Sequence, residues 1–389
     1  MQTKVLIVAL LIPLLSSCFS PRKLYYGLKF KRLHETLVGL EHTGRRPFCA
    51  RQIQSELVWL YYDHPDLDRI GKRLSDLSYA LEYPEKMPKE DTQSPEDGSY
   101  GRCFEEWFFK LNESFDRFSG LSQAPQVPPS FLDRINTPEK LTLHMRSILI
   151  SDVKNPLDSH YRELNETTAA LLRMLLRGIP KNYPNHPELE KAFLDFVMNE
   201  LRDPQTGYWG VHYRDGNTIR RSKDLSTSFH IISYLKGEVP DWPKIIDTTL
   251  KIKDQDFPEG WLMKGEYWNH LSMDVIEIFR LGWPHADPAQ RIQISSEIQK
   301  LLDHALHDTL LPDGQFKLSK NDESLEDAMY YGTETLRRAG YFDRKLRFWT
   351  DQDFKDSAQI KSKILAQVKS RIQEAAPGSS YQTLLENLQ

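Results

Sequence analysis

Apolar residues along most of this chain recur every three or four positions, which is the spacing of one face of an α-helix. This periodicity predicts an almost entirely helical protein. Helix-start signals support it, because Pro138 follows Thr137 and Pro288 follows Asp287. The expected helices cover residues 23–42, 50–62, 67–82, 102–118, 138–151, 156–176, 187–202, 224–236, 242–253, 267–281, 288–310, 324–339 and 353–372.

Two polar stretches that contain proline interrupt the helical pattern, Tyr83–Tyr100 and Gly120–Pro129. Such a stretch is typical of a surface loop and also of a domain boundary. We favour loops within one domain. The alternative is that residues 19–129 form a separate helical subdomain.

A weak internal repeat runs through the second half of the chain. Gly207, Gly260 and Gly314 each follow one expected helix and precede another, each has an aromatic residue within two positions after it, and they are 53 and 54 residues apart. Two periods before Gly207 the pattern meets Gly101, but the intermediate step falls on Lys154. A unit of two helices cannot bury its own apolar faces, so such units stack. A turn glycine is expected to take a backbone conformation that other residues disfavour.

These Gly-aromatic turns ahead of a helix resemble those of the α/α toroid proteins, which include squalene cyclases, protein prenyltransferases and several polysaccharide lyases. The resemblance covers about residues 201–342. It implies an all-α fold, an α/α toroid of up to about six helical hairpins of about 53 residues. The toroid domain would span residues 18–345, and residues 346–389 would form a C-terminal helical extension.

The N-terminus has the layout of a secretory signal: Lys4 precedes the apolar run Val5–Leu15, which is too short to span a bilayer. Leu15-Ser16-Ser17-Cys18 resembles the lipobox of bacterial lipoproteins. This resemblance implies that residues 1–17 are removed and that acyl chains on Cys18 hold the protein on the periplasmic side of a bilayer. Phe19 after the cysteine resembles lipoproteins sorted to the outer membrane. An ordinary cleaved signal and a soluble secreted protein are the alternative.

Charge and cysteine content narrow the function further. Without residues 1–17 the chain has 50 basic and 55 acidic residues and no dense basic run, which disfavours nucleic-acid binding. Two cysteines remain, Cys49 and Cys103, and an exported protein meets an oxidising compartment. We predict a disulfide between them, with two buried free thiols as the alternative. The low cysteine count excludes a multi-cysteine zinc site.

Candidate catalytic residues lie on the helices that follow the three turns. His230 and Asp274 interrupt apolar runs, where an ionisable group is costly unless it meets a partner or a polar cavity. As an enzyme the protein would use one of them as proton acceptor and a tyrosine, Tyr331 or Tyr213, as proton donor. The alternative is that they make satisfied internal hydrogen bonds.

Candidate binding residues surround the same turns. Aromatic rings after a turn glycine can stack on sugar rings, although they more often pack the repeat. Arg214, in a polar hairpin, could reach a uronate carboxylate. The expected substrate-binding set is Trp209, Arg214, Trp261, Trp268, His270 and Asp327.

The sequence lacks the motifs that several classes of enzyme require. The chain has no DxDD or DDxxD run for terpene chemistry, no HExxH, no GxSxG, no P-loop and no dinucleotide fingerprint. His304 and His307 lie on a polar helix face, so we expect neither metal nor cofactor. The resulting hypothesis is a periplasmic glycan hydrolase or lyase with a polysaccharide partner. A non-catalytic binder of glycan or apolar ligand and an envelope scaffold are the alternatives.

Overall fold

The computed structural model describes residues 20–42, 47–89, 92–120, 125–152, 155–177, 188–319, 322, 324–372 and 379–389. Cys18 and the expected signal sequence, residues 1–17, lie outside these residues. The structure is predominantly helical, which confirms the helical class. Two compact units make up the chain, and each is described by itself. The first unit comprises residues 1–201 and 211–221, and the second comprises residues 202–210 and 222–389.

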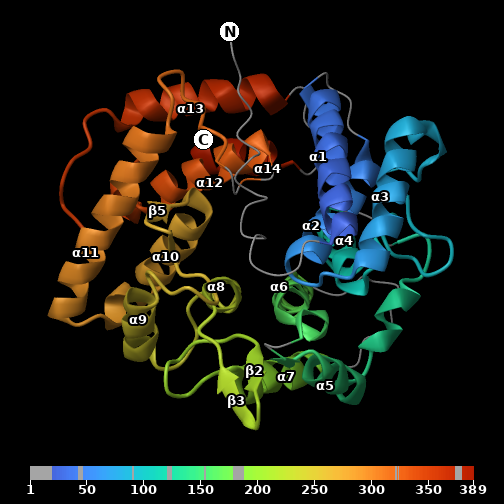
Figure 1. The fold of residues 1–389 in the computed structure, drawn as a ribbon. Coiled ribbons are helices and arrows are strands. Elements are labelled where there is room, and N and C mark those ends of the chain that lie inside the picture. Colours follow the sequence, from blue (N-terminus) through green and yellow to red (C-terminus); the bar gives the residue numbers. More distant parts are fainter. Residues whose placement is uncertain are drawn as a thin grey trace. The chain divides into compact units, whose positions relative to one another are not determined.

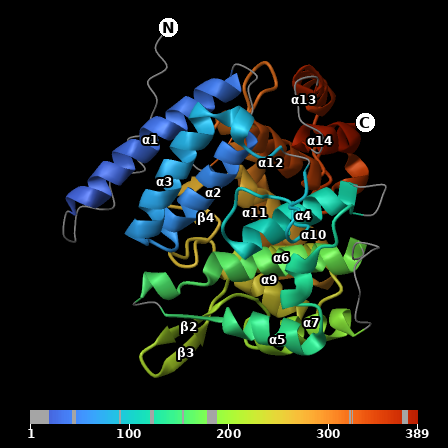
Figure 2. The same cartoon turned by 90° about the vertical axis from the view of Figure 1, so that its right-hand side faces the viewer.

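Helices of the first unit pack in pairs (Figure 2), and α1, α2, α3 and residues 103–109 share an apolar core. α1 packs on α2 and α3, α4 packs on α6, and α5 packs on α7. The bounds are α1 Pro21–His42, α2 Phe48–Tyr62, α3 Leu67–Glu82, α4 Trp107–Gly120, α5 Pro138–Ser147, α6 Tyr161–Arg177 and α7 Leu189–Phe196, with short helices η2 Pro84–Lys86, η3 Ser130–Arg134, η4 Pro156–Asp158 and the π-helix η5 Val197–Leu201.

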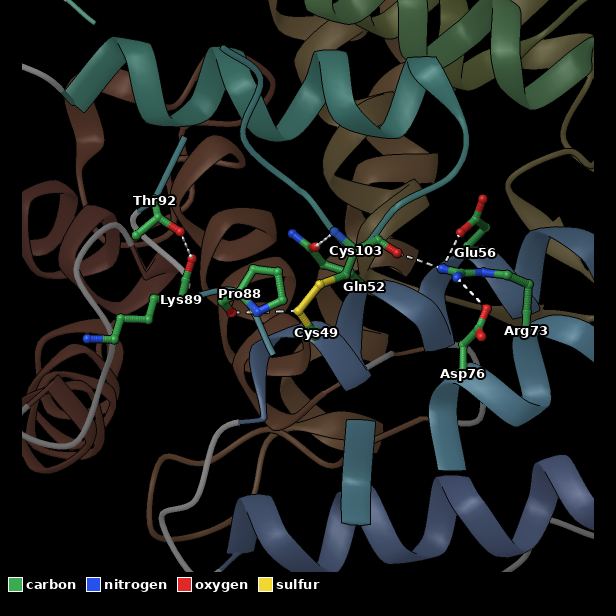
Figure 3. Close-up of a disulfide and its surroundings, with 9 residues drawn as sticks. All are labelled: Cys49, Gln52, Glu56, Arg73, Asp76, Pro88, Lys89, Thr92 and Cys103. Atoms are coloured by element: carbon green, nitrogen blue, oxygen red, sulfur yellow. Dashed lines mark hydrogen bonds and ion pairs between the residues drawn. A yellow bond between two sulfur atoms is a disulfide. The ribbon is translucent and has the colours of Figure 1, made fainter. Parts of the chain in front are cut away.

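A disulfide joins Cys49 on α2 to Cys103, with Cα atoms 5.3 Å apart, and this confirms the predicted pairing (Figure 3). Beside it the fully buried Glu56 carboxylate pairs with Arg73 at 2.6 Å and accepts the backbone N–H groups of Glu105 and Glu106. These bonds hold residues 102–106 in a turn followed by an irregular segment. The expected helix 102–118 therefore begins only at Trp107.

A small sheet also belongs to the first unit. Its strand β1 (Ile150–Asp152) pairs in parallel with β2 (His212–Asp215), and β2 pairs antiparallel with β3 (Thr218–Arg221). The expected hairpin around Arg214 is therefore confirmed. The expected helix 138–151 is wrong at its end, because the backbone of Ile150 pairs with His212 instead of continuing α5.

Helices of the second unit alternate between two sets (Figure 1). α8, α10, α12 and α14 lie side by side in that order, and we call them the helix layer. α9 packs on α10 and α11, α11 packs also on α12, and α13 packs on α14. The bounds are α8 Leu225–Tyr234, α9 Trp242–Lys251, α10 Asn269–Gly282, η6 Trp283–His285, α11 Pro288–Asp303, the π-helix η7 His304–Thr309, α12 Leu325–Arg338, η8 Arg344–Leu346, α13 Ser357–Ile372 and α14 Ser380–Leu388, with a β-hairpin of β4 Leu262–Met263 and β5 Glu266–Tyr267.

The three glycine turns all precede a helix of the helix layer. Trp209 pairs back with Arg202, Phe316 pairs back with Leu310, and the N–H of Leu262 donates to the carbonyl of Lys253. The helices after these turns are neighbours, since α10 packs against both α8 and α12.

Glycine is required at these turns for two different reasons. Gly207 and Gly314 have φ of +76° and +91°, as expected for turn glycines. The expectation is wrong for Gly260, which has no positive φ. A Cβ atom there would lie 1.9 Å from the carbonyl oxygen of Ile252, so close backbone approach is what demands glycine.

No helix within the described part of the chain combines the length and apolar character needed to cross a membrane.

Candidate functional site

Three side chains at the start of α10 and on α12 form what we call the aromatic cluster. Its members are Trp268, His270 and Tyr331, and all three are half-buried. The His270 and Tyr331 rings stack face to face, with centroids 4.0 Å apart and planes inclined by 7°. Trp268 meets His270 edge-on at 4.8 Å and lies 6.5 Å from Tyr331. These residues, expected separately from the sequence, therefore lie together.

The start of α10 is held in place by hydrogen bonds to its neighbours. The side-chain amide of Asn269 donates to Thr309 at 3.0 Å, and the hydroxyl of Thr335 on α12 donates to the carbonyl of Asn269 at 2.9 Å. The indole N–H of Trp268 donates to Asp322 at 2.8 Å. These bonds fix the register of α10 against α12 and so place His270 opposite Tyr331.

Burial lowers the pKa of His270 to about 4. The imidazole is therefore neutral at neutral pH and has one nitrogen able to accept a hydrogen bond or a proton. A neutral histidine next to a phenol is an arrangement that can bind a sugar hydroxyl and can also move a proton.

Asp274 lies one turn further along α10 and has no exposed surface. Neither carboxylate oxygen has a hydrogen-bond partner among the described residues. Burial raises the pKa of this carboxyl well above its ordinary value, Arg338 opposes the shift, and Glu277 and Asp224 add to it. Asp274 is therefore shielded from solvent, and burial favours its protonated form.

A buried network of ion pairs crosses the helix layer. It lies beyond Asp274, towards the C-terminal ends of α10 and α12. Glu277 pairs with Arg280 at 2.7 Å, and Glu334 pairs with Arg337 at 2.7 Å and with Arg338 at 3.2 Å. Burial alone would raise the pKa of either glutamate, but the arginines outweigh it and lower both.

The network reaches all four helices of the layer. Arg338 approaches Glu277 at 3.9 Å and lies 5.5 Å from the ring centre of Phe229 on α8, while Asn387 on α14 donates to Glu334 at 3.0 Å. We did not predict this network from the sequence. The signal that could have found it is the spacing of glutamate and arginine three or four residues apart on two successive helices.

Trp209 and Trp261 are fully buried and pack the turns, which matches the packing alternative. The indole N–H of Trp261 donates to the carbonyl of Thr249 at 2.8 Å, and Lys253 lies 5.0 Å from the centre of its ring. The backbone N–H of Trp209 donates to Ser228 at 3.0 Å. Neither ring offers a face to a ligand in this structure.

The remaining candidates lie elsewhere. His230 on α8 is half-buried, with its ring 6.0 Å from Tyr234, and is not part of the aromatic cluster. Asp327 is bonded to Ser324 in the first turn of α12, where Ser324 caps the helix. Arg214 is exposed on β2 of the first unit, and Tyr213 beside it is buried.

A pocket of about 260 Å³ lies in the second unit between α13 on one side and η7 with the turn after it on the other. It contains none of the predicted site residues. Its lining is apolar apart from one lysine and consists of Leu306, Leu310, Leu311, Pro312, Gly314, Ile360 and Lys363. Within the described residues, no group of three or more histidine, cysteine or acidic side chains gathers in a way that could hold a metal ion.

Comparison with known proteins finds no matching family model, no matching curated protein and no matching solved structure.

Proposed function

We propose that this protein is a lipid-anchored periplasmic protein of α/α toroid type that binds a cell-envelope polysaccharide at the aromatic cluster. The single observation that carries the proposal is the convergence of Trp268, His270 and Tyr331, each half-buried, from two neighbouring helices. Sugar rings present apolar C–H faces and hydroxyl groups together, and an aromatic surface with a neutral imidazole and a phenol is complementary to both.

The toroid assignment is supported by a repeated order in the second unit: a helix outside the helix layer (α9, α11), then a glycine turn, then a helix of the layer (α10, α12). The anchor at Cys18 is supported by Leu15-Ser16-Ser17-Cys18 and the short apolar run before it. The disulfide fits an oxidising compartment outside the cytoplasm. Together these observations support a location among envelope glycans, and Phe19 after the cysteine supports the outer-membrane side.

A second candidate function is cleavage of a uronate-containing glycan by β-elimination. His270, kept neutral by burial, would remove the proton next to the uronate carboxylate, and the phenol of Tyr331 would give a proton to the leaving oxygen. Hydrolysis by two carboxylates has less support, because Asp274 has no exposed surface and the Glu277 and Glu334 side chains are bound to arginines.

Glycan binding by purified wild type, Trp268→Ala and Trp283→Ala proteins tests the proposal. Trp283 is the matched control, since it is also half-buried but lies just beyond the other end of α10. We expect Trp268→Ala to weaken binding of an envelope polysaccharide about tenfold or more and Trp283→Ala to leave it unchanged. Equal binding by wild type and Trp268→Ala would rule out this site.

The elimination reaction has its own readout. A uronate polysaccharide cleaved in this way gains a carbon–carbon double bond, which absorbs ultraviolet light. Tyr331→Phe keeps the ring stack and removes the phenolic proton, so it should retain glycan binding and lose product formation. Binding without any unsaturated product from wild type would leave a non-catalytic binder.

A further inference from the structure

α1 exposes an apolar stripe to solvent. Leu24, Tyr25 and Leu28 are 51%, 61% and 57% exposed, and Arg32 continues the same helix face one turn later. Leu24, Leu28 and Arg32 follow one another at spacings of four, and Tyr25 is three residues before Leu28, so the four side chains lie on one face of the helix. Large apolar side chains normally avoid such grouping on a protein surface, and a grouped set indicates an interaction site.

The opposite face of α1 packs against the core of the first unit. Tyr26, Phe30 and Leu33 pack against that core, and Leu37 is buried. α1 contacts α3 and α2 through this side (Figure 2). The exposed stripe therefore cannot turn inward without breaking existing contacts.

Charge on α1 is strongly one-sided. Its first thirteen residues, Pro21–Leu33, contain no acid, whereas the full chain has a net charge of −4. Two of the bases form exposed ion pairs, Arg22 with Asp68 and Lys31 with Glu35, and such pairs are worth little and exchange readily with another anion. The basic residues of this stretch are Arg22, Lys23, Lys29, Lys31 and Arg32.

We propose that α1 is an interfacial helix that lies on an anionic bilayer surface, with Leu24, Tyr25 and Leu28 inserted among the lipids and the bases on phosphate groups. An apolar face flanked by lysine and arginine is the pattern of helices that bind in the plane of a membrane. The position of α1 close to Cys18 favours a lipid bilayer over other binding partners. α1 begins three residues after Cys18, so at most about 11 Å of chain separates it from the proposed acyl chains.

This inference goes beyond the proposed glycan binding and does not depend on it. It uses the proposed anchor at Cys18 only to explain why a bilayer is near. The docked helix would add a second attachment and set the orientation of the first unit on the membrane. The test therefore uses the unacylated chain, so that its outcome is separate from that of lipidation.

The experiment is co-sedimentation of the mature chain from residue 18, carrying Cys18→Ser, with vesicles of phosphatidylglycerol and phosphatidylcholine or of phosphatidylcholine alone. We expect binding to the anionic vesicles that is about tenfold or more tighter than to the neutral ones and that falls as salt is raised. Leu24→Asn/Leu28→Asn and Lys29→Glu/Arg32→Glu should each weaken it about tenfold or more.

Leu143→Asn is the matched control, because Leu143 is 71% exposed on α5 of the same unit and should not affect binding. A thermal unfolding midpoint equal to that of wild type shows that each variant is folded. Failure of the wild-type chain to bind anionic vesicles overturns the proposal, as does undiminished binding by Leu24→Asn/Leu28→Asn. A wild-type dimer that this double variant converts to monomer would identify a second copy of the chain as the occupant and would also overturn it.

Discussion

His270 lies flat against Tyr331, with ring centres 4.0 Å apart and planes inclined by only 7°. The two residues are 61 positions apart in the chain and come from α10 and α12. The pair is therefore a product of helix packing. It makes the start of α10 sensitive to the protonation of one imidazole.

The first prediction concerns pH. Because burial lowers the pKa of His270 from 6.5 to about 4, the unfolded chain binds a proton at this position more readily than the folded protein. Stability is therefore complete above pH 6.5 and falls as the pH drops from 6.5 towards 4. At pH 5 the loss should be about 1–2 kcal/mol.

Denaturant unfolding of His270→Phe at pH 7 and pH 5 measures this effect. The phenylalanine keeps the stack on Tyr331 and cannot be protonated, so the variant should lose less stability than wild type between the two pH values. His307→Gln, at an exposed histidine on η7, is the control and should follow wild type. An identical pH response in His270→Phe and wild type would show that His270 is not shielded from water.

Compared with wild type, Asp274→Asn should be more stable at neutral pH than at acid pH. The raised pKa of Asp274 means that the folded state keeps the proton while the unfolded chain releases it above about pH 4. This term favours folding below that pH and opposes it increasingly as the pH rises. The neutral, near-isosteric asparagine removes the term, so its unfolding free energy relative to wild type should rise between pH 4 and pH 7 by about 1–3 kcal/mol. A variant that loses stability over this range would indicate an ionised, paired Asp274.

Gly260→Ala should destabilise the second unit by about 2–4 kcal/mol, because the added methyl group would meet the carbonyl oxygen of Ile252 and force the backbone apart. Thermal or denaturant unfolding gives the value. Gly39→Ala is the control: nothing lies within 4 Å of its added Cβ, so it should be neutral or stabilising by up to about 1 kcal/mol. A cost for Gly260→Ala below that of an ordinary surface change would mean that the turn can relax.

Removal of the disulfide should cost about 4 kcal/mol in the chain-entropy model, since Cys49 and Cys103 close a loop across a sequence separation of 54. Unfolding of Cys49→Ala/Cys103→Ala, compared with the oxidised and the chemically reduced wild type, measures it. The reduced wild type and the double variant should agree. If reduction leaves the unfolding midpoint unchanged, the bond does not constrain the unfolded chain.

Cys18 should carry acyl chains in protein extracted from the membranes of the cell that makes it. Mass spectrometry of the mature N-terminus should show cleavage after Ser17 and a lipid-modified cysteine. Cys18→Ser is the control and should block both processing and membrane attachment. An unmodified Cys18, or a cut at another position, would contradict the lipobox interpretation.

The amino-acid sequence by itself determined the helical class and most helix positions, because apolar periodicity and helix caps are local properties. Asp287 shows this, since its side chain and that of Gln290 form the capping box that starts α11. Local spacing also found the three glycine turns. Local spacing gave the wrong prediction where the backbone hydrogen-bonds to a segment distant in the chain. Ile150, for example, pairs with His212 instead of continuing α5.

Only the tertiary structure decided which of the predicted site residues are accessible. Trp209, Trp261 and Trp268 all follow or flank a glycine turn in the sequence, yet two are fully buried and one is half-buried beside His270. α14 was not predicted, and its place beside α12 is a matter of packing. The physical reason is the same in each case: the burial of a side chain depends on which helices meet it, and those helices lie tens of residues away in the chain.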